Sequence, residues 1–84
     1  MTKNVLITGI TGFAGSHLID HILQNTDYKV FGLKRMNSSL KNVQHALDKI
    51  HLIDGDLLDE TSLINALNIA KPDQIYHLGP LSQL

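Results

Sequence analysis

Near its amino terminus the chain reads Val5-Leu6-Ile7-Thr8-Gly9-Ile10-Thr11-Gly12-Phe13-Ala14-Gly15-Ser16. The pattern predicts a short apolar strand, a turn with glycine at every third position, and the start of a helix. Gly9 suits a tight turn because it has no Cβ, Gly12 leaves room for a phosphate beside the main chain, and Gly15 lets the helix pack closely. A helix also begins with free N–H groups and a positive dipole end, which favour an anion. The stretch therefore predicts a backbone site for the pyrophosphate of a dinucleotide.

The candidate pyrophosphate ligands are the residues of this turn: Gly9, Ile10, Thr11, Gly12, Phe13, Ala14 and Gly15. Their Gly-x-x-Gly-x-x-Gly spacing differs from the Gly-x-Gly-x-x-Gly of the usual dinucleotide fingerprint, and glycines alone are a weak signal. Their place between a predicted strand and a predicted helix makes the signal specific. A purely structural glycine turn is the alternative. A phosphate loop of the NTPase type is disfavoured because no Gly-Lys-Ser/Thr follows.

The composition is that of one small globular domain. The chain has 84 residues, of which 43% are hydrophobic and 18% are charged, a balance that argues against disorder. The formal net charge is −1 and the seven basic residues are scattered, which gives no electrostatic reason to expect a nucleic-acid partner. There is no cysteine, and only three consecutive apolar residues follow Asn4, too few for a signal peptide or a membrane span. We expect a cytoplasmic protein with no membrane partner.

Strand-like and helix-like segments alternate along the whole chain. The predicted strands are 4–8, 28–33, 50–53 and 74–78. Helices are predicted from Phe13 to about Asn25, around Leu40 to Leu47, and from an N-cap at Asp59 to a stop at Pro72. The apolar faces of the two longer helices comprise Ala14, Leu18, Ile19, Ile22 and Leu23, and Leu63, Ile64, Ala66, Leu67 and Ala70. The order predicts an α/β fold, the N-terminal half of a Rossmann fold over residues 1–84, with a parallel sheet of about four strands and helices on both faces.

The end of the second predicted strand carries the residues that would read the adenosine ribose. Lys34 and Arg35 lie there, where an acidic residue would bond a 2′-hydroxyl and a basic one can hold a 2′-phosphate. The Arg35 fork suits phosphate oxygens, and Asn37 and Ser38 are further donors. The pattern favours NADP over NAD; a solvated basic pair is the alternative.

The segment Gly55-Asp56-Leu57 follows the third predicted strand, at the carboxyl edge of the sheet where ligands bind. Asp56 can accept a hydrogen bond from the adenine amino group while Leu57 packs near the ring. The alternative is that Asp56 only caps a turn.

Three histidines are candidates for other chemistry. His17 and His21 stand four residues apart on a predicted helix, as two metal ligands would. No third ligand is evident, so we expect two exposed histidines and no metal. His77 is expected to pack within its strand and not to act in catalysis.

These segments together resemble the extended short-chain dehydrogenase/reductase family. The resemblance is carried by 8–15, by Gly55-Asp56-Leu57, by Lys71-Pro72-Asp73 and by Tyr76-His77-Leu78-Gly79. Within the family, the sequence of 32–39 and the segment His77-Leu78-Gly79 with Ser82 are similar to those of GDP-mannose 4,6-dehydratases and GDP-4-keto-6-deoxymannose reductases. The resemblance implies NADP and a GDP-sugar as ligands of the full enzyme, and it places Leu78, Gly79 and Ser82 beside the cofactor. One departure is Pro80, which removes an N–H that could face the cofactor.

By this resemblance the full enzyme removes a hydride from C4 of the sugar, eliminates water, and returns the hydride. The family's Tyr-x-x-x-Lys pair is missing, since Gly32 and Pro80 stand four residues after Tyr28 and Tyr76, so no catalytic residue is expected in this chain. A reductase or another nucleotide-sugar epimerase is an alternative, as is a stand-alone nucleotide-binding module without catalysis. The fourth predicted strand would be an exposed edge, which predicts self-association through 74–78 or marginal folding.

Overall fold

The computed structural model describes residues 3–10, 12–56 and 58–78. Strands and helices alternate within these residues, as the sequence predicts. The elements are β1 (Asn4–Thr8), α1 (Phe13–Asn25), β2 (Lys29–Lys34), the 3₁₀ helix η1 (Lys41–Ala46), β3 (Ile50–Asp54), α2 (Glu60–Ala70) and β4 (Gln74–His77).

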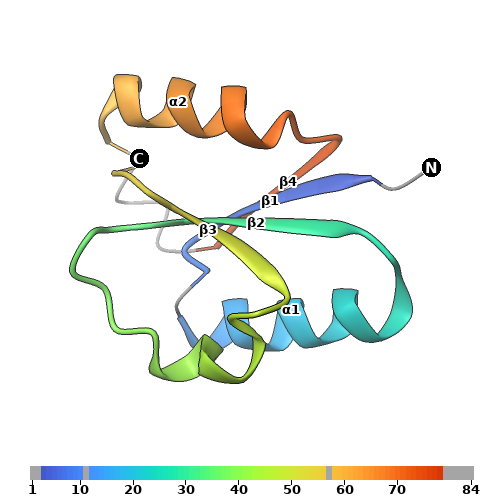
Figure 1. Cartoon of the computed structure of the whole chain (residues 1–84). Coiled ribbons are helices and arrows are strands. Elements are labelled where there is room, and N and C mark those ends of the chain that lie inside the picture. The colour runs from blue at the N-terminus through green and yellow to red at the C-terminus, as the bar shows by residue number, and fades with distance from the viewer. Residues whose placement is uncertain (1–2, 11, 57, 79–84) are drawn as a thin grey trace.

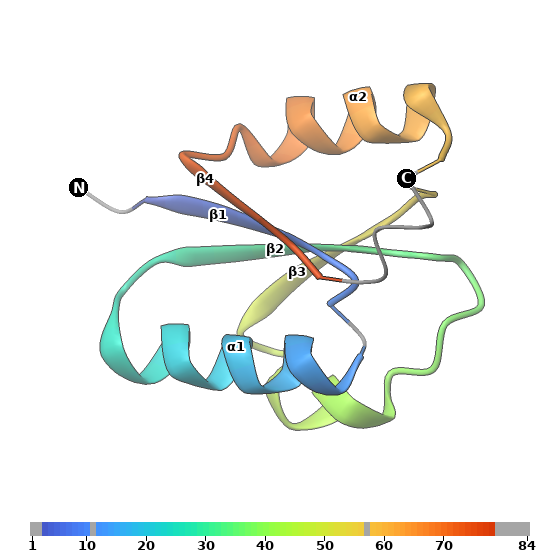
Figure 2. The same ribbon diagram turned by 180° about the vertical axis from the view of Figure 1, so that it is seen from behind.

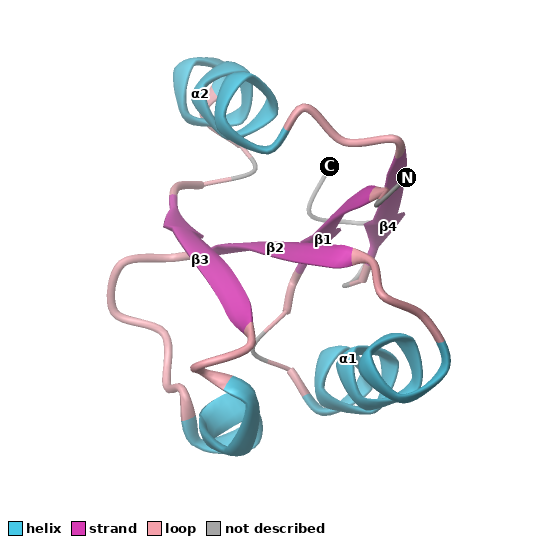
Figure 3. Ribbon diagram, turned by 45° about the vertical axis from the view of Figure 1, so that its right-hand side comes forward, coloured by secondary structure: helices cyan, strands magenta, loops and turns pink. Residues whose placement is uncertain are grey.

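The four strands form one parallel sheet in the order β3-β2-β1-β4. Helix α2 covers one face of this sheet, while α1 and η1 cover the other (Figure 1, Figure 3). The turn after β1, the loop after β2 and the loop after β3 all leave the same edge of the sheet, because parallel strands end together. The α/β fold expected from the sequence is therefore confirmed, and this carboxyl edge is where the candidate ligand residues gather.

The core lies in two layers, one on each face of the sheet. Val5 and Ile7 of β1 belong to the cluster under α1 and η1, whereas Leu6 between them belongs to the cluster under α2. This alternation is the two-residue period of a strand that is buried on both faces. All three side chains are fully buried, so packing on both faces of the sheet fixes β1 and the start of the turn that follows it.

Two residues expected on the buried helix faces are exposed, and those two predictions are wrong. Ala14 is exposed because α1 turns Gly15, its neighbour, against the main chain of Ile10. Ile64 is 49% exposed because α2 packs through residues spaced by three and four, and Ile64 falls on the flank of that stripe. The residues that form the stripe are Leu63, Ala66, Leu67 and Ala70.

Strand β1 and helix α1 have the predicted ends, whereas each of the other elements differs from its prediction by one or two residues at one or both ends. Tyr28 lies before β2 because its N–H donates to Thr26 Oγ1 at 3.1 Å. Strand β2 continues through Lys34, which pairs with Asp54 in the register of β3. Helix α2 ends at Ala70, and Lys71 takes a left-handed conformation with φ of 44°, as the residue before Pro72 cannot easily continue a helix.

Candidate functional site

The turn after β1 has the backbone geometry that the glycine pattern predicts. Gly9 has a φ of +70°, a conformation that residues with a Cβ rarely adopt. The Gly12 N–H donates to the Gly9 carbonyl at 3.2 Å and closes the turn. A Cβ on Gly9 would also collide with the carbonyl oxygen of Leu78. The turn is therefore held by its own hydrogen bond and by close contact with Leu78, the residue after β4.

Gly15 and Gly12 differ in what surrounds them. A Cβ on Gly15 would lie 2.7 Å from the carbonyl carbon of Ile10, so the close packing of α1 requires glycine there. At Gly12 the nearest atom to such a Cβ is the Gly9 oxygen at 3.5 Å, an ordinary contact distance. The packing of the described residues therefore explains Gly9 and Gly15 but not Gly12, and none of these residues fills the space beside Gly12.

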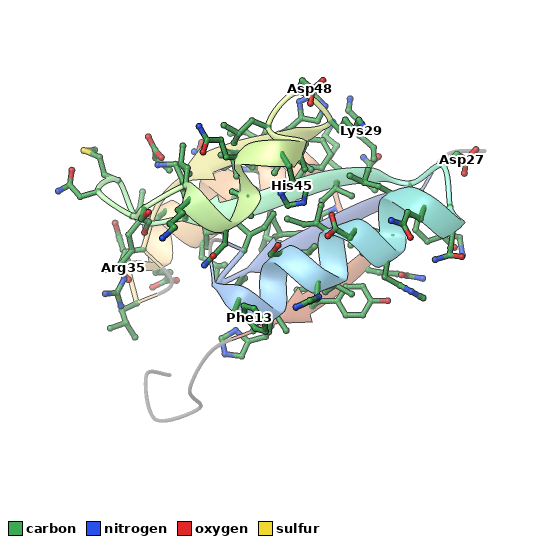
Figure 4. The ribbon with its side chains drawn as sticks, turned by 90° about the horizontal axis from the view of Figure 1, so that it is seen from below. Phe13, Asp27, Lys29, Arg35, His45 and Asp48 are labelled. Atoms are coloured by element: carbon green, nitrogen blue, oxygen red, sulfur yellow. The ribbon has the colours of Figure 1, made fainter. Side chains whose placement is uncertain are left out.

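Among the described residues, no side chain caps the amino end of α1. Gly12 is its N-cap residue and there is no acidic residue in the first turn. By contrast, Asp59 caps α2 by accepting from the Thr61 N–H at 3.1 Å. Because the first N–H groups of a helix have no partner within the helix, the first turn of α1 can serve an anion. Phe13, labelled at the start of α1 in Figure 4, is 73% exposed. Its ring meets the His17 ring edge-on.

A cavity of about 550 Å³ lies between the carboxyl ends of β2 and β3. It brings together Arg35, Asn37, Ser38 and Asp56, which the sequence singles out as the adenosine-binding residues. It also includes side chains that sequence reasoning missed, namely Met36, Asp54 and Ser62. The two predicted parts of an adenosine site therefore share one cavity, and the roles of the individual residues stay predictions.

The Asp56 carboxylate already has a partner in the main chain. Its Oδ1 accepts from the Leu58 N–H at 3.0 Å, which is the turn-capping arrangement that the sequence left open. A carboxylate has about four acceptor sites, so this bond does not occupy the group. Asp56 can cap its turn and still accept from a base.

Lys34 has a different place from its neighbour Arg35. Its ammonium forms an ion pair with Asp54, and the Lys34 side chain is only 12% exposed. Arg35 is exposed at the cavity. The basic pair in the sequence therefore separates into an internal lysine and an arginine that is open to a ligand. The signal for this is the strand register, which pairs Lys34 with Asp54.

The histidines have protein partners among the described residues. His17 contacts Phe13, and His21 Nδ1 lies 3.3 Å from the side-chain nitrogen of Asn25. His77 is half-buried, with its Nδ1 2.7 Å from Thr8 Oγ1, which confirms that it packs within the sheet. In the described ranges no three His, Cys, Asp or Glu side chains come together as a metal site would require.

Four of the predicted cofactor residues, Thr11, Leu57, Gly79 and Ser82, lie outside the described residues. Leu78 is described, and its N–H donates to the Thr8 carbonyl at 3.1 Å. Its carbonyl oxygen lies against Gly9. The segment after β4 therefore starts beside the glycine turn.

The family described as GDP-mannose 4,6 dehydratase matches residues 6–84. The chain belongs to the GDP-mannose 4,6-dehydratase family. This confirms the resemblance to the extended short-chain dehydrogenases/reductases, of which this family is part.

Relatives in the GDP-mannose 4,6-dehydratase family match nearly the whole chain. The GDP-mannose 4,6 dehydratase of Homo sapiens is 41% identical over 93 residues, covering 98% of this chain and 25% of that protein. The GDP-mannose 4,6-dehydratase of Vibrio cholerae is 38% identical over 93 residues, covering 100% of this chain and 25% of that protein. The chain therefore spans about a quarter of the length of these relatives.

A solved structure of another dehydratase has the same fold. The dTDP-glucose 4,6-dehydratase of Bacillus anthracis, solved in complex with NAD, matches with a TM-score of 0.83 and 23% identity. The match covers 96% of this chain and 28% of that one. At that identity the likeness shows the fold alone. Across the residues described here, no helix combines the length and the apolar character that crossing a bilayer demands.

Proposed function

We propose that the chain is the NADP-binding portion of a GDP-mannose 4,6-dehydratase. The family and the identity of the relatives support the dehydratase. The cavity that joins Arg35, Asn37 and Ser38 to Asp56 supports the cofactor and is the observation that carries the proposal. The chain spans only a quarter of its relatives, so the reaction on the sugar belongs to the whole protein.

The glycine turn is proposed to hold the pyrophosphate. Among the described residues, no atom fills the space beside Gly12 and no side chain caps the first turn of α1, which fits two anionic groups that approach the main chain. Main-chain N–H groups at a helix start bind phosphate without any basic side chain. In this proposal the residues of 9–15 fix the cofactor's position, and no charge of their own is needed.

Arg35 is proposed to bind the 2′-phosphate of NADP. Its guanidinium offers several donors in one plane, and hydrogen bonds to a phosphate are charge-assisted. Asn37 and Ser38 would add neutral donors from the same loop, and Asp56 would accept from the adenine amino group. NAD has a hydroxyl in place of this phosphate, so Arg35 favours NADP. The NAD in the Bacillus anthracis structure belongs to that protein.

The bound cofactor would accept a hydride and later donate it back. The proposed reaction of the whole protein takes a hydride from C4 of the sugar, loses water and gives the hydride back. The described residues contribute the binding and orientation of the cofactor. The catalytic Tyr-x-x-x-Lys pair implied by the family resemblance is absent from these 84 residues, so the chain by itself is proposed to be inactive.

Calorimetric titration of the chain with NADP, NAD and GDP-mannose tests this proposal. We expect NADP to bind about tenfold or more tightly than NAD, since charge-assisted bonds contribute about 1.5–3 kcal/mol. GDP-mannose alone is expected to bind weakly. A chain that binds neither dinucleotide would overturn the proposal.

Two further parts of the proposal concern the molecule as a whole. We propose that it associates with itself through the strand around 74–78, because β4 has one neighbour, β1, within the described sheet. A free strand edge presents unpaired N–H and C=O groups to a second chain. We also propose a cytoplasmic location, as expected from the sequence, which fractionation of cells would test.

A further inference from the structure

Lys34 and Asp54 face each other where β2 and β3 end. They are partners in the parallel register, and the Lys34 ammonium forms an ion pair with Asp54 Oδ1. Asp54 is 53% exposed and lines the cavity that also holds Arg35. A carboxylate at the proposed 2′-phosphate site is therefore neutralised by an ammonium that is itself nearly buried.

The same ammonium supports the loop that carries Arg35. It donates to the main-chain carbonyl of Arg35 at 3.3 Å and to that of Met36 at 3.4 Å. The Ser38 N–H donates to the same Arg35 carbonyl at 3.0 Å. An ammonium has three donors, and these two carbonyls together with Asp54 account for all three. Lys34 therefore has no donor left for a ligand, and any effect on binding must pass through its neighbours.

We propose that Lys34 sets the preference for NADP by neutralising Asp54, an inference that rests on the proposed function of this cavity. A phosphate monoester carries a charge of about −1.5 to −2 near pH 7. The cavity is only about 550 Å³, so charges on its lining lie within roughly one Debye length, about 10 Å, and interact without full screening. An unpaired Asp54 would repel the 2′-phosphate. The 2′-hydroxyl of NAD would experience little of this repulsion.

A purely structural role for Lys34 makes a different prediction. If the lysine only held the loop in shape, its loss would weaken NADP and NAD alike, because both share the adenosine that fills the cavity. Neutralisation of Asp54 acts on the phosphate alone. The ratio of the two dissociation constants therefore separates the two roles, whereas the affinity for NADP does not.

The test compares this ratio in the chain and in Lys34→Met, Asp54→Asn and the double variant. Lys34→Met should weaken NADP about tenfold more than NAD, and the double variant should restore the ratio to within about threefold of the unchanged chain. Asp54→Asn alone leaves Lys34 unpaired and should raise the preference for NADP about two- to fivefold. Lys29→Met is the matched control, because Lys29 lies at the opposite end of β2 from Arg35 (Figure 4) and should leave the ratio unchanged.

Calorimetry gives the two dissociation constants, and circular dichroism shows whether each variant is folded. A ratio that Lys34→Met leaves unchanged, or that Asp54→Asn does not restore in the double variant, overturns the role of Lys34. If Lys34→Met does not fold, Asp54→Asn decides, and an unchanged ratio there overturns the inference. An unmodified chain that binds neither dinucleotide overturns the proposed function and this inference with it.

Discussion

Gly9, Gly12 and Gly15 stand at equal spacing in the sequence, but their surroundings differ. The protein's own atoms would collide with a side chain at Gly9 or Gly15. At Gly12 a methyl group would meet no atom of the described residues closer than 3.5 Å, and its φ of −77° suits any residue. Folding therefore requires glycine at positions 9 and 15, whereas at position 12 the proposed binding of a ligand is the reason for glycine.

Gly12→Ala is expected to leave the fold intact and to weaken dinucleotide binding. The free energy of unfolding should change by no more than about 0.5 kcal/mol, the usual range for an unstrained surface substitution. The affinity for NADP should fall about tenfold or more, or by about 1.4 kcal/mol, because the methyl group occupies the space proposed for the pyrophosphate. Urea unfolding and calorimetry measure the two effects.

Gly15→Ala is the matched control for this change. Its methyl group would meet the main chain of Ile10, which cannot move aside as a side chain could. We expect a loss of about 1–3 kcal/mol in the free energy of unfolding. If Gly12→Ala binds NADP as tightly as the unchanged chain does, the pyrophosphate lies elsewhere.

Arg35→Asp is expected to change the choice between the two cofactors. It replaces the proposed phosphate ligand by a carboxylate that suits a 2′-hydroxyl. NADP should bind about ten- to a hundredfold more weakly, while NAD should change by less than about threefold. Lys41→Asp, at the start of η1, makes the same change of charge outside the cavity and serves as the control. Equal losses for NADP and NAD in Arg35→Asp would remove Arg35 from the 2′-phosphate site.

Parts of the candidate site can be predicted from the sequence where a position requires one particular residue type. The positive φ of Gly9 and the exposed place of Arg35 follow from glycine and arginine in a known order of elements. The partnership of Lys34 with Asp54 could not be predicted in this way. It depends on how β2 and β3 are aligned across twenty residues of chain, and a shift of one residue would separate the pair.

At the scale of elements, the two helices begin in different ways. Helix α2 starts with a carboxylate whose two oxygens accept from the Thr61 N–H and the Ser62 hydroxyl. Helix α1 starts at a glycine with no side chain to offer. Asp59 caps the start of α2, whereas no described side chain caps the start of α1.

Asp59→Ala is expected to destabilise the fold through α2. Loss of an N-cap costs about 1 kcal/mol, within a range of about 0.5–2 kcal/mol. The midpoint of urea unfolding should fall accordingly, and the affinity for NADP should change little because Asp59 is not among the proposed ligands. Asp59→Asn keeps an oxygen that can accept from the Thr61 N–H and should retain most of the stability. An unchanged midpoint in Asp59→Ala would contradict the cap.

Element type could be predicted more firmly than element ends. The N-cap at Asp59 follows from its place before an apolar helix pattern, and the structure confirms it. The start of β2 depends on the hydrogen bond between the Tyr28 N–H and Thr26 Oγ1. The spacing of hydrophobic residues does not reveal such a local bond. Ile64 shows a related limit. Its spacing fits the helix face, but the neighbouring sheet covers only the stripe of Leu63, Ala66, Leu67 and Ala70.

At the scale of the whole molecule, the sheet that the described strands form is bordered by β3 on one side and β4 on the other (Figure 2). The parallel order follows from alternating strands and helices, which is why the sequence predicts it. The residues of β4 are Gln74, Ile75, Tyr76 and His77. None of them is a lysine, a proline or an acidic residue, the groups that usually protect a strand edge.

The last prediction concerns self-association through β4. Ile75 is 55% exposed on this strand and Ile64 is 49% exposed on α2. Ile75→Lys should lower association by placing a charge on the edge, whereas Ile64→Lys, an equally apolar and exposed site away from the edge, should not. Sedimentation velocity over a range of concentrations measures the effect. A chain that stays a folded monomer at high concentration, or an equal effect of both lysines, would show that the free edge of β4 does not recruit a second copy.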